Sequence, residues 1–163
     1  NLTYDTIYHE HLSFLSIRPL QKLFARHGLE IFNANVVQAQ GQSLRLFVGY
    51  RGNHLVLETV LELTRKELEY RLDSVQSYFN LARRVESSRS TLVSLLRRLK
   101  SEGKTIAAYG APAKGNTLLN YCDIGADILD YALEDLPTKQ GLYTPGKRIP
   151  VVDREQAALN PPD

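Results

Sequence analysis

The stretch Lys104-Thr-Ile-Ala-Ala-Tyr-Gly-Ala-Pro-Ala-Lys-Gly-Asn-Thr-Leu-Leu-Asn120 decides the fold class of this chain. Its residues 105–109 are a short apolar run, which is typical of a buried parallel strand. Residues 110–115 hold two glycines and a proline, so they predict a tight turn, and residues 116–122 continue as a helix. A strand, a tight turn and a helix in this order begin a βαβ unit, and we therefore predict an α/β domain.

The segments that follow continue the alternation of strand and helix. Residues 128–134 predict a second strand and residues 147–152 a third, and Asp153 is placed to cap a short final helix. This order predicts a Rossmann-like domain over residues 103–163. The chain stops at Asp163, where that topology calls for a further strand, so we expect the sheet to be truncated at its far edge.

Two long segments upstream carry apolar residues at helical spacing, over residues 54–70 and 74–102. They separate the predicted α/β domain from the N-terminal part of the chain. We therefore expect three regions, which are residues 1–51, a helical connector over residues 52–102, and the domain over residues 103–163.

The second of these helices carries several cations on its polar side, which suits either a nucleic acid or an acidic partner, or simply a solvated helix face. No aromatic residues are interleaved with the cations, and the net charge of the whole chain is only +2. We favour the solvated face and predict no nucleic-acid partner. The cations are Arg83, Arg84, Arg89, Arg97, Arg98 and Lys100.

The N-terminal region predicts a helix followed by a β-hairpin. Ser16 is a candidate N-cap for a helix that Gly28 ends. Residues 29–40 and 43–51 then alternate apolar and polar side chains around Gly41-Gln42, which is the pattern of two strands joined by a tight turn.

The glycine-containing turn is a candidate phosphate site. Backbone N–H groups of Gly110, Ala111 and Gly115 can approach an anion, the helix N-terminus adds a partial positive charge, and Lys114 adds a full one. The run matches neither the Gly-x-Gly-x-x-Gly fingerprint nor the P-loop pattern. A purely structural turn between strand and helix is the alternative.

A second chemical feature lies near the N-terminus, where Tyr8, His9, Glu10 and His11 are consecutive. A positioned imidazole beside a carboxylate can act as a general base near neutral pH. In an extended conformation His9 and His11 face the same way and can chelate a metal, but that needs a third ligand. Polar groups with a structural role are a further alternative, and we predict no metal site.

Four motifs, in this order, resemble the C-terminal part of the sugar-nucleotide C-methyltransferases that act on deoxysugar precursors. They are Tyr8-His-Glu-His11, Gly41-Gln-Ser-Leu-Arg45, Ala108-Tyr-Gly-Ala-Pro-Ala-Lys-Gly-Asn116 and Lys139-Gln-Gly-Leu-Tyr-Thr-Pro-Gly146. The resemblance implies transfer of a methyl group from S-adenosylmethionine to a ring carbon beside a keto group of a nucleotide-linked sugar. It also implies that residues 1–51 are the tail of a class I methyltransferase domain.

The resemblance carries catalytic roles onto the family's Tyr-x-Glu-His pattern. It implies that His11 removes the proton from the carbon beside the ketone, that Tyr8 helps to stabilise the enolate oxygen, and that Glu10 orients or tunes the imidazole. His9 is the secondary candidate for the base.

The resemblance further implies a diphosphate at the glycine run and a substrate of the nucleotide-diphosphate sugar class, linked to dTDP. Asp135, at the end of the second predicted strand, has the position from which a carboxylate often meets a ribose hydroxyl in Rossmann-like folds, or else it caps the loop before Pro137. The loop over residues 139–146 offers a cation and a tyrosine that could cover the nucleotide, or else it is a plain surface loop. The predicted substrate-binding residues are Tyr109, Gly110, Ala111, Lys114, Gly115, Asn116, Asp135, Lys139 and Tyr143.

Composition limits the remaining possibilities. A chain of 163 residues with 43% hydrophobic and 23% charged residues is ordinary for a globular protein. No apolar run approaches the roughly 18–20 residues that span a bilayer, and residues 1–15 lack a secretory pattern, so we expect a cytoplasmic protein without membrane contact. The single cysteine, Cys122, excludes an internal disulfide, and we expect it to be a small buried apolar residue.

The sequence holds no methionine and no glycine-rich loop after an N-terminal strand. We therefore expect a fragment whose S-adenosylmethionine site lies in an upstream domain, and which is inactive alone. One alternative is a non-catalytic nucleotide-sugar-binding module that lacks the methyl-donor site. Another is half of a small-molecule dehydrogenase, which the departure from the dinucleotide fingerprint disfavours.

Overall fold

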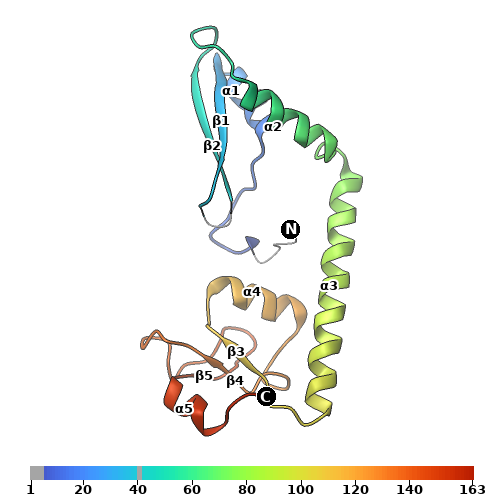
Figure 1. The fold of residues 1–163 in the computed structure, drawn as a ribbon, viewed down its shortest axis with the longest axis vertical. Helices are drawn as coiled ribbons and strands as arrows, with labels where there is room; N and C mark the ends of the chain where they lie inside the picture. The colour runs from blue at the N-terminus through green and yellow to red at the C-terminus, as the bar shows by residue number, and fades with distance from the viewer. Residues whose placement is uncertain (1–5, 40–41) are drawn as a thin grey trace. The chain divides into compact units, whose positions relative to one another are not determined.

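The computed structural model describes residues 6–39 and 42–163. They fall into two compact units. One unit contains the described N-terminal residues up to Leu12 together with Ala82–Asp163, and the other contains Ser13–Leu81. Figure 1 labels the helices and strands of both units.

The unit Ser13–Leu81 is built on an antiparallel hairpin. Strands β1 (Leu29–Val37) and β2 (Ser43–Tyr50) pair from Leu29 opposite Tyr50 to Val37 opposite Ser43, which confirms the predicted strand pairing. Of the predicted turn Gly41-Gln42, Gly41 lies outside the described residues. Helices α1 (Ile17–Ala25) and α2 (Glu58–Glu69) contact the hairpin. The shared core consists of Ile17, Leu20, Ile31, Ala34 and Val60.

Helix α1 begins where the sequence predicts, but the cap differs from the expectation. Ser16 occupies the N-cap position without a side-chain capping bond. Instead the Glu67 carboxylate of α2 accepts hydrogen bonds from the backbone N–H groups of Ile17 and Arg18, the latter at 3.1 Å. A carboxylate at a helix N-terminus satisfies unpaired N–H groups and complements the helix dipole, so α2 caps α1.

Helix α3 (Val75–Ser101) begins in one unit and ends in the other, as predicted within one residue at each end. Three of its cations contact carboxylates of the same chain. Arg89 lies 3.0 Å from Glu86, Arg98 lies 3.0 Å from Glu102, and Lys100 lies 2.7 Å from Asp130. Despite its 27 residues α3 is too polar to cross a membrane, and no other described helix is long and apolar enough either. The cytoplasmic location stays a prediction.

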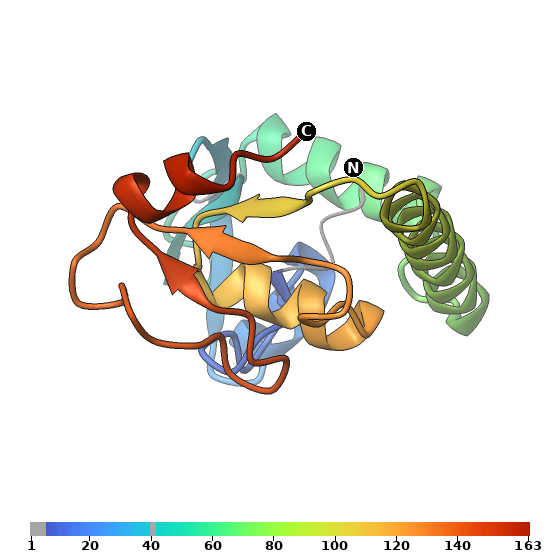
Figure 2. The same ribbon diagram turned by 90° about the horizontal axis from the view of Figure 1, so that it is seen from below.

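The other unit is a small α/β arrangement, which confirms the predicted class. Strands β3 (Ala107–Tyr109), β4 (Tyr131–Leu133) and β5 (Val151–Val152) form a parallel sheet in the order β3-β4-β5. Helices α4 (Ala113–Cys122) and α5 (Arg154–Leu159) lie on opposite faces of this sheet, as Figure 2 shows. Asp153 caps α5 by accepting from the Gln156 N–H at 2.8 Å, as predicted.

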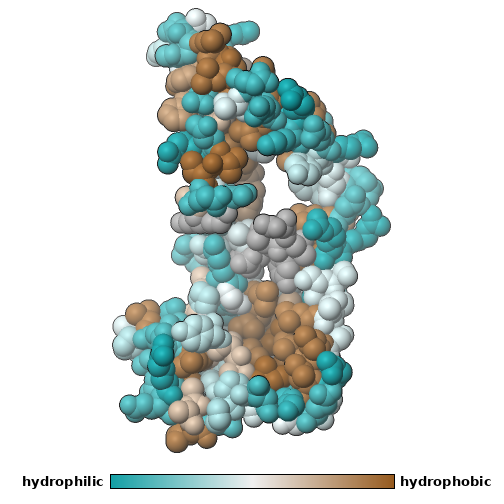
Figure 3. All heavy atoms as spheres, viewed as in Figure 1, coloured by the Kyte–Doolittle hydropathy of each residue, from teal (hydrophilic) through white to brown (hydrophobic). Residues whose placement is uncertain are grey.

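The strands are shorter than the apolar runs that predict them. Ile128 and Leu129, expected in the second strand, precede β4 and are buried in the core together with Cys122, which confirms the expected burial of the cysteine. Apolar side chains fill the space where α4 meets the end of α3, seen in brown in Figure 3. The burial of an apolar run therefore does not require that all of it pairs in the sheet.

Candidate functional site

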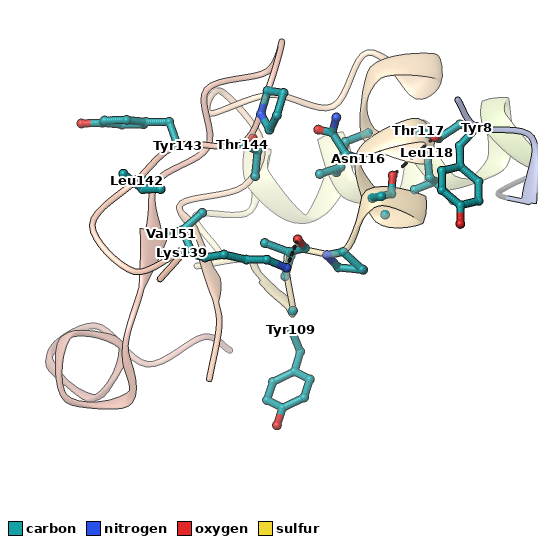
Figure 4. A pocket seen from close by; sticks show the side chains of 18 of the residues that line it. Tyr8, Tyr109, Asn116, Thr117, Leu118, Lys139, Leu142, Tyr143, Thr144 and Val151 are labelled. Carbon is teal, nitrogen blue, oxygen red and sulfur yellow. Dashed lines mark hydrogen bonds between the residues drawn. The ribbon is translucent and has the colours of Figure 1, made fainter. Parts of the chain in front are cut away.

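A pocket of about 580 Å³ opens at the ends of β3 and β5. Its walls come from the turn after β3, from the first two turns of α4, and from the loop that links β4 to β5 (Figure 4). Tyr8 and His9 of the N-terminal segment also line it. The other lining residues are Ala108, Tyr109, Gly110, Ala111, Pro112, Ala113, Gly115, Asn116, Thr117, Leu118, Leu119, Lys139, Leu142, Tyr143, Thr144, Pro145 and Val151.

Most of the predicted substrate-binding residues therefore meet at one pocket, although they come from segments about 30 residues apart. Lys114 and Asp135 are the two that do not line it. Tyr109 and Tyr143 line the rim, with 74% and 66% of their surface exposed, and Figure 4 shows both rings directed outward. Their aromatic faces are thus accessible to a ligand that reaches beyond the pocket.

The start of α4 differs from the prediction. The helix begins at Ala113 with Pro112 as N-cap, so Gly115 lies inside the first turn and not in a loop. A Cβ at Gly115 would lie 3.3 Å from two ring carbons of Pro112, which is tighter than most real contacts. Gly115 is therefore explained by the packing of the proline ring. Gly110, with φ +84°, is the residue that needs the left-handed conformation.

Two of the three amides predicted for phosphate, those of Gly110 and Ala111, already have partners within the chain. The Gly110 N–H donates to the Leu133 carbonyl at 2.6 Å, and the Ala111 N–H donates to Oε2 of Glu134 at 3.0 Å. These contacts close the turn between β3 and α4. A ligand phosphate needs other donors, or must displace the Glu134 carboxylate.

Lys139 also contacts Ala111 and Glu134. Its Nζ donates to the Ala111 carbonyl at 3.0 Å and lies 3.4 Å from Oε2 of Glu134. The Ala111 N–H, then the Leu136 N–H and the Lys139 ammonium, hold the pKa of Glu134 below its ordinary value. The charge of Lys139 is thus partly balanced inside the protein. Glu134 was not predicted, because only the folded chain brings it against a turn 23 residues away.

Asp135 contacts protein groups and lies outside the pocket. It accepts from Nε and Nη2 of Arg154 at 2.8 and 3.0 Å, and from the Tyr109 hydroxyl at 3.2 Å. The hydrogen bonds of Arg154 come first among the causes that lower the pKa of Asp135. The ribose contact expected for Asp135 stays a prediction, and Arg154 at the start of α5 is a partner that the sequence did not reveal.

The N-terminal segment is a turn, which corrects the extended conformation considered from the sequence. The His11 N–H donates to the Tyr8 carbonyl at 2.9 Å, and the two ring centroids are 4.5 Å apart. Tyr8 and His11 thus lie together, whereas the extended form would place His9 beside His11. Within residues 6–39 and 42–163 no group of three His, Cys, Asp or Glu side chains is placed to hold a metal ion.

The hydrogen bonds of this turn assign a tautomer. Nδ1 of His11 lies 2.8 Å from the Thr6 carbonyl, which can only accept, so Nδ1 carries the proton and Nε2 holds the lone pair of the neutral ring. Glu10 accepts from the Tyr8 hydroxyl at 3.1 Å, so it orients the phenol. Burial first and this contact with Glu10 second raise the pKa of Tyr8. The Thr6 carbonyl takes the role toward His11 that was expected of Glu10.

Comparison with known proteins agrees with this arrangement. Residues 38–163, which include the three-stranded sheet and the lining of its pocket apart from Tyr8 and His9, match the family described as the C-methyltransferase C-terminal domain. The chain belongs to this family. It is also 35% identical over 164 residues to the C-methyltransferase NovU of Streptomyces niveus, across all of this chain and 39% of NovU. The chain thus spans about two fifths of the length of that relative.

The family match and the resemblance found from the sequence coincide, with one distinction. The C-methyltransferase C-terminal domain begins its match at residue 38, so it includes Glu134, Lys139 and Asn116. Tyr8, Glu10 and His11 precede it and lie within the alignment with NovU. The predicted substrate pocket therefore belongs to the family domain, and the predicted catalytic turn contributes to its lining.

Proposed function

We propose that this chain is the nucleotide-sugar-binding part of an S-adenosylmethionine-dependent C-methyltransferase. The proposed substrate is a nucleotide-diphosphate 4-keto-deoxysugar, linked to dTDP. The observation that carries the proposal is the pocket of about 580 Å³, because it gathers family motifs from β3, α4 and the 139–146 loop and has Tyr8 in its lining. We further propose that the three-stranded sheet is part of a Rossmann-like arrangement.

The start of α4 supports a diphosphate at this pocket. Its first turn carries no acidic residue, and its N-cap, Pro112, has no side-chain acceptor to occupy the first N–H groups. An anion near these groups is stabilised by the helix dipole. We therefore place the diphosphate at the first turn of α4, with Lys114 half-buried beside it, and not on the occupied amides of Gly110 and Ala111.

Proton transfer is the step proposed for the N-terminal turn. The carbon beside a ketone is acidic, and Nε2 of His11, with the proton fixed on Nδ1, is the atom that accepts its proton. In the structure the Glu10 carboxylate accepts the single hydroxyl proton of Tyr8, so the Tyr8 hydroxyl turns from Glu10 to donate that proton in a hydrogen bond to the enolate oxygen. A single positioned base contributes roughly 10²–10⁴ to the rate.

The residues of this chain do not fit the methyl donor. Dinucleotide-like sites use open glycine-loop amides and a carboxylate on the ribose, whereas here Glu134 occupies the Ala111 amide and Arg154 binds Asp135. S-adenosylmethionine supplies the electrophilic methyl group when it is bound. We place its site in the part of the intact protein that corresponds to the rest of NovU.

Calorimetry on this chain tests the proposal. The chain should bind dTDP measurably and S-adenosylmethionine weakly or not at all. Replacing Lys114 with alanine should weaken dTDP binding by about 1–3 kcal/mol, the usual range for a charge-assisted contact. Tight binding of S-adenosylmethionine to this chain would contradict the division of sites.

A non-catalytic nucleotide-sugar-binding module is the second candidate, and one observation favours it. His11 and Glu10 do not line the pocket, although Tyr8 does. The two candidates differ in proton exchange at the sugar carbon beside the ketone, which only a methyltransferase with a working base promotes.

A further inference from the structure

Asn120, on the last turn of α4, links this helix by a hydrogen bond to the loop over residues 139–146, which lines the pocket. Its Nδ2 donates to the Pro145 carbonyl at 3.1 Å and to the Asn116 carbonyl at 2.9 Å. The next residue of the loop, Gly146, has φ +77°, and a Cβ there would overlap Oδ1 of Asn120. The Asn120 amide thus fills space that only a glycine at position 146 leaves open.

The same contacts decide which way the Asn116 amide faces. Backbone carbonyls only accept, so Asn120 must turn its NH₂ group toward Pro145 and Asn116. Oδ1 of Asn116 lies 3.2 Å from that NH₂ group and accepts from it. Nδ2, the donor of Asn116, is then at the opposite end of its amide. Asn116 lines the pocket and projects from α4 in Figure 4.

We propose that Asn116 donates its Nδ2–H to a diphosphate oxygen of the bound nucleotide sugar, and that Asn120 is a positioning residue that keeps it in this orientation. The inference rests on the proposed function. Phosphate oxygens only accept hydrogen bonds, so a flipped Asn116 would present Oδ1 and repel the ligand. The backbone amides of Gly110 and Ala111 already donate to groups of the chain. The Asn116 side chain therefore supplies the neutral donor that these amides do not offer to a phosphate.

The side-chain amide signals of Asn116 in a nitrogen-15 NMR spectrum test the contact. They are assigned through their absence in Asn116→Asp. Adding dTDP to the wild type should shift them, and thymidine, which has no phosphate, should not. Asn116→Asp should weaken dTDP binding at least about tenfold, since a carboxylate replaces the donor. Asn160→Asp adds the same charge at an exposed position outside the pocket and should leave the affinity unchanged.

A pair of glycine variants tests the positioning role. Gly141 and Gly146 lie in one loop with φ +76° and +77°, but a Cβ at Gly141 meets nothing within 4 Å. Both alanine variants therefore carry similar backbone strain, and only Gly146→Ala displaces Asn120. It should weaken dTDP binding several-fold more than Gly141→Ala and abolish the shift of the Asn116 signals. Asn120→Asp cannot donate to the Pro145 carbonyl. This variant should also weaken dTDP binding and abolish the shift of the Asn116 signals, without backbone strain.

The outcomes distinguish a failure of this inference from a failure of the proposed function. If the wild type does not bind dTDP, the proposed function and the inference both fall. If dTDP binds but the Asn116 signals do not move, or if Gly146→Ala and Gly141→Ala bind dTDP equally, the inference alone is wrong.

Discussion

The Glu134 carboxylate accepts a hydrogen bond from the Ala111 backbone N–H at 3.0 Å, and this contact holds the turn between β3 and α4. Glu134 also accepts from the Leu136 N–H at 3.1 Å, and its side chain is only 14% exposed. An anion of the protein thus occupies an amide that the sequence assigns to a bound phosphate. The turn is stabilised from within, and the pocket beside it can stay formed without ligand.

Glu134→Gln should lower the free energy of unfolding at neutral pH and reduce its dependence on acid. Because folding lowers the pKa of Glu134, its stabilisation is present above the unfolded value of about 4.3 and is lost as the pH falls through the folded value. Urea denaturation from about pH 7 to pH 3 measures this. Glu62→Gln, at an exposed position in α2, is the control, and an unchanged pH profile for Glu134→Gln would contradict the assignment.

Asp130 fastens the end of α3 to the sheet. Both of its oxygens lie 2.7 Å from the Lys100 Nζ, and Oδ2 also accepts from the Ile106 N–H at 2.9 Å. The hydrogen bond from Lys100 comes first in lowering the pKa of Asp130. Asp130→Asn should therefore cost about 1–3 kcal/mol above pH 4, and the difference from wild type should shrink as the pH falls below the unfolded pKa of about 3.9.

The thermal or urea unfolding of Asp130→Asn is compared with that of a control variant that has the same net charge. Asp127→Asn removes a carboxylate three residues away, at an exposed position. A loss of stability as large in Asp127→Asn as in Asp130→Asn would show that net charge, and not the contact with Lys100, is responsible.

The elements that follow local rules were predictable from the sequence. Asp153 caps α5, Gly103 follows α3 with φ +79°, and β1 pairs with β2 in the expected hairpin. Each depends on residues close together in the chain or on a simple period. The exceptions depend on the tertiary fold, as when the Pro112 ring explains Gly115.

The candidate site shows the same division. Seven of the nine predicted substrate-binding residues line the pocket, because the motifs quoted from the sequence contain them. The partners of the predicted residues were not predicted, since Glu134 reaches Ala111, and Arg154 reaches Asp135, only after the strands pair. The direction of the Asn116 amide depends in the same way on Pro145, 29 residues downstream.

The cap of α1 by Glu67 gives a prediction for the other unit. Glu67→Ala leaves the N–H groups of Ile17 and Arg18 without this acceptor and should cost about 1–2 kcal/mol, the usual range for a lost N-cap. Glu69→Ala changes an exposed carboxylate of the same helix and should cost much less. Equal losses for the two variants in urea denaturation would show that Glu67 does not act as the cap.

Tyr8 and Glu10 should act as a unit in the intact protein, because the Glu10 carboxylate accepts from the Tyr8 hydroxyl. Tyr8→Phe and Glu10→Gln should each lower kcat by less than the roughly 10²–10⁴ expected for His11→Asn. The double variant should be little slower than Tyr8→Phe alone. If the two effects on kcat multiply, Glu10 has a role that does not pass through the phenol.

Proton exchange at the sugar carbon tests the central claim most directly. The intact protein is mixed with a dTDP-4-keto-deoxysugar in deuterium oxide without methyl donor, and NMR follows the hydrogen on the carbon beside the ketone. The wild type should exchange this hydrogen, and His11→Asn should not, while both bind the nucleotide sugar alike. Equal exchange by wild type and His11→Asn would contradict the assignment of His11 as the base, and His9 would become the next residue to test.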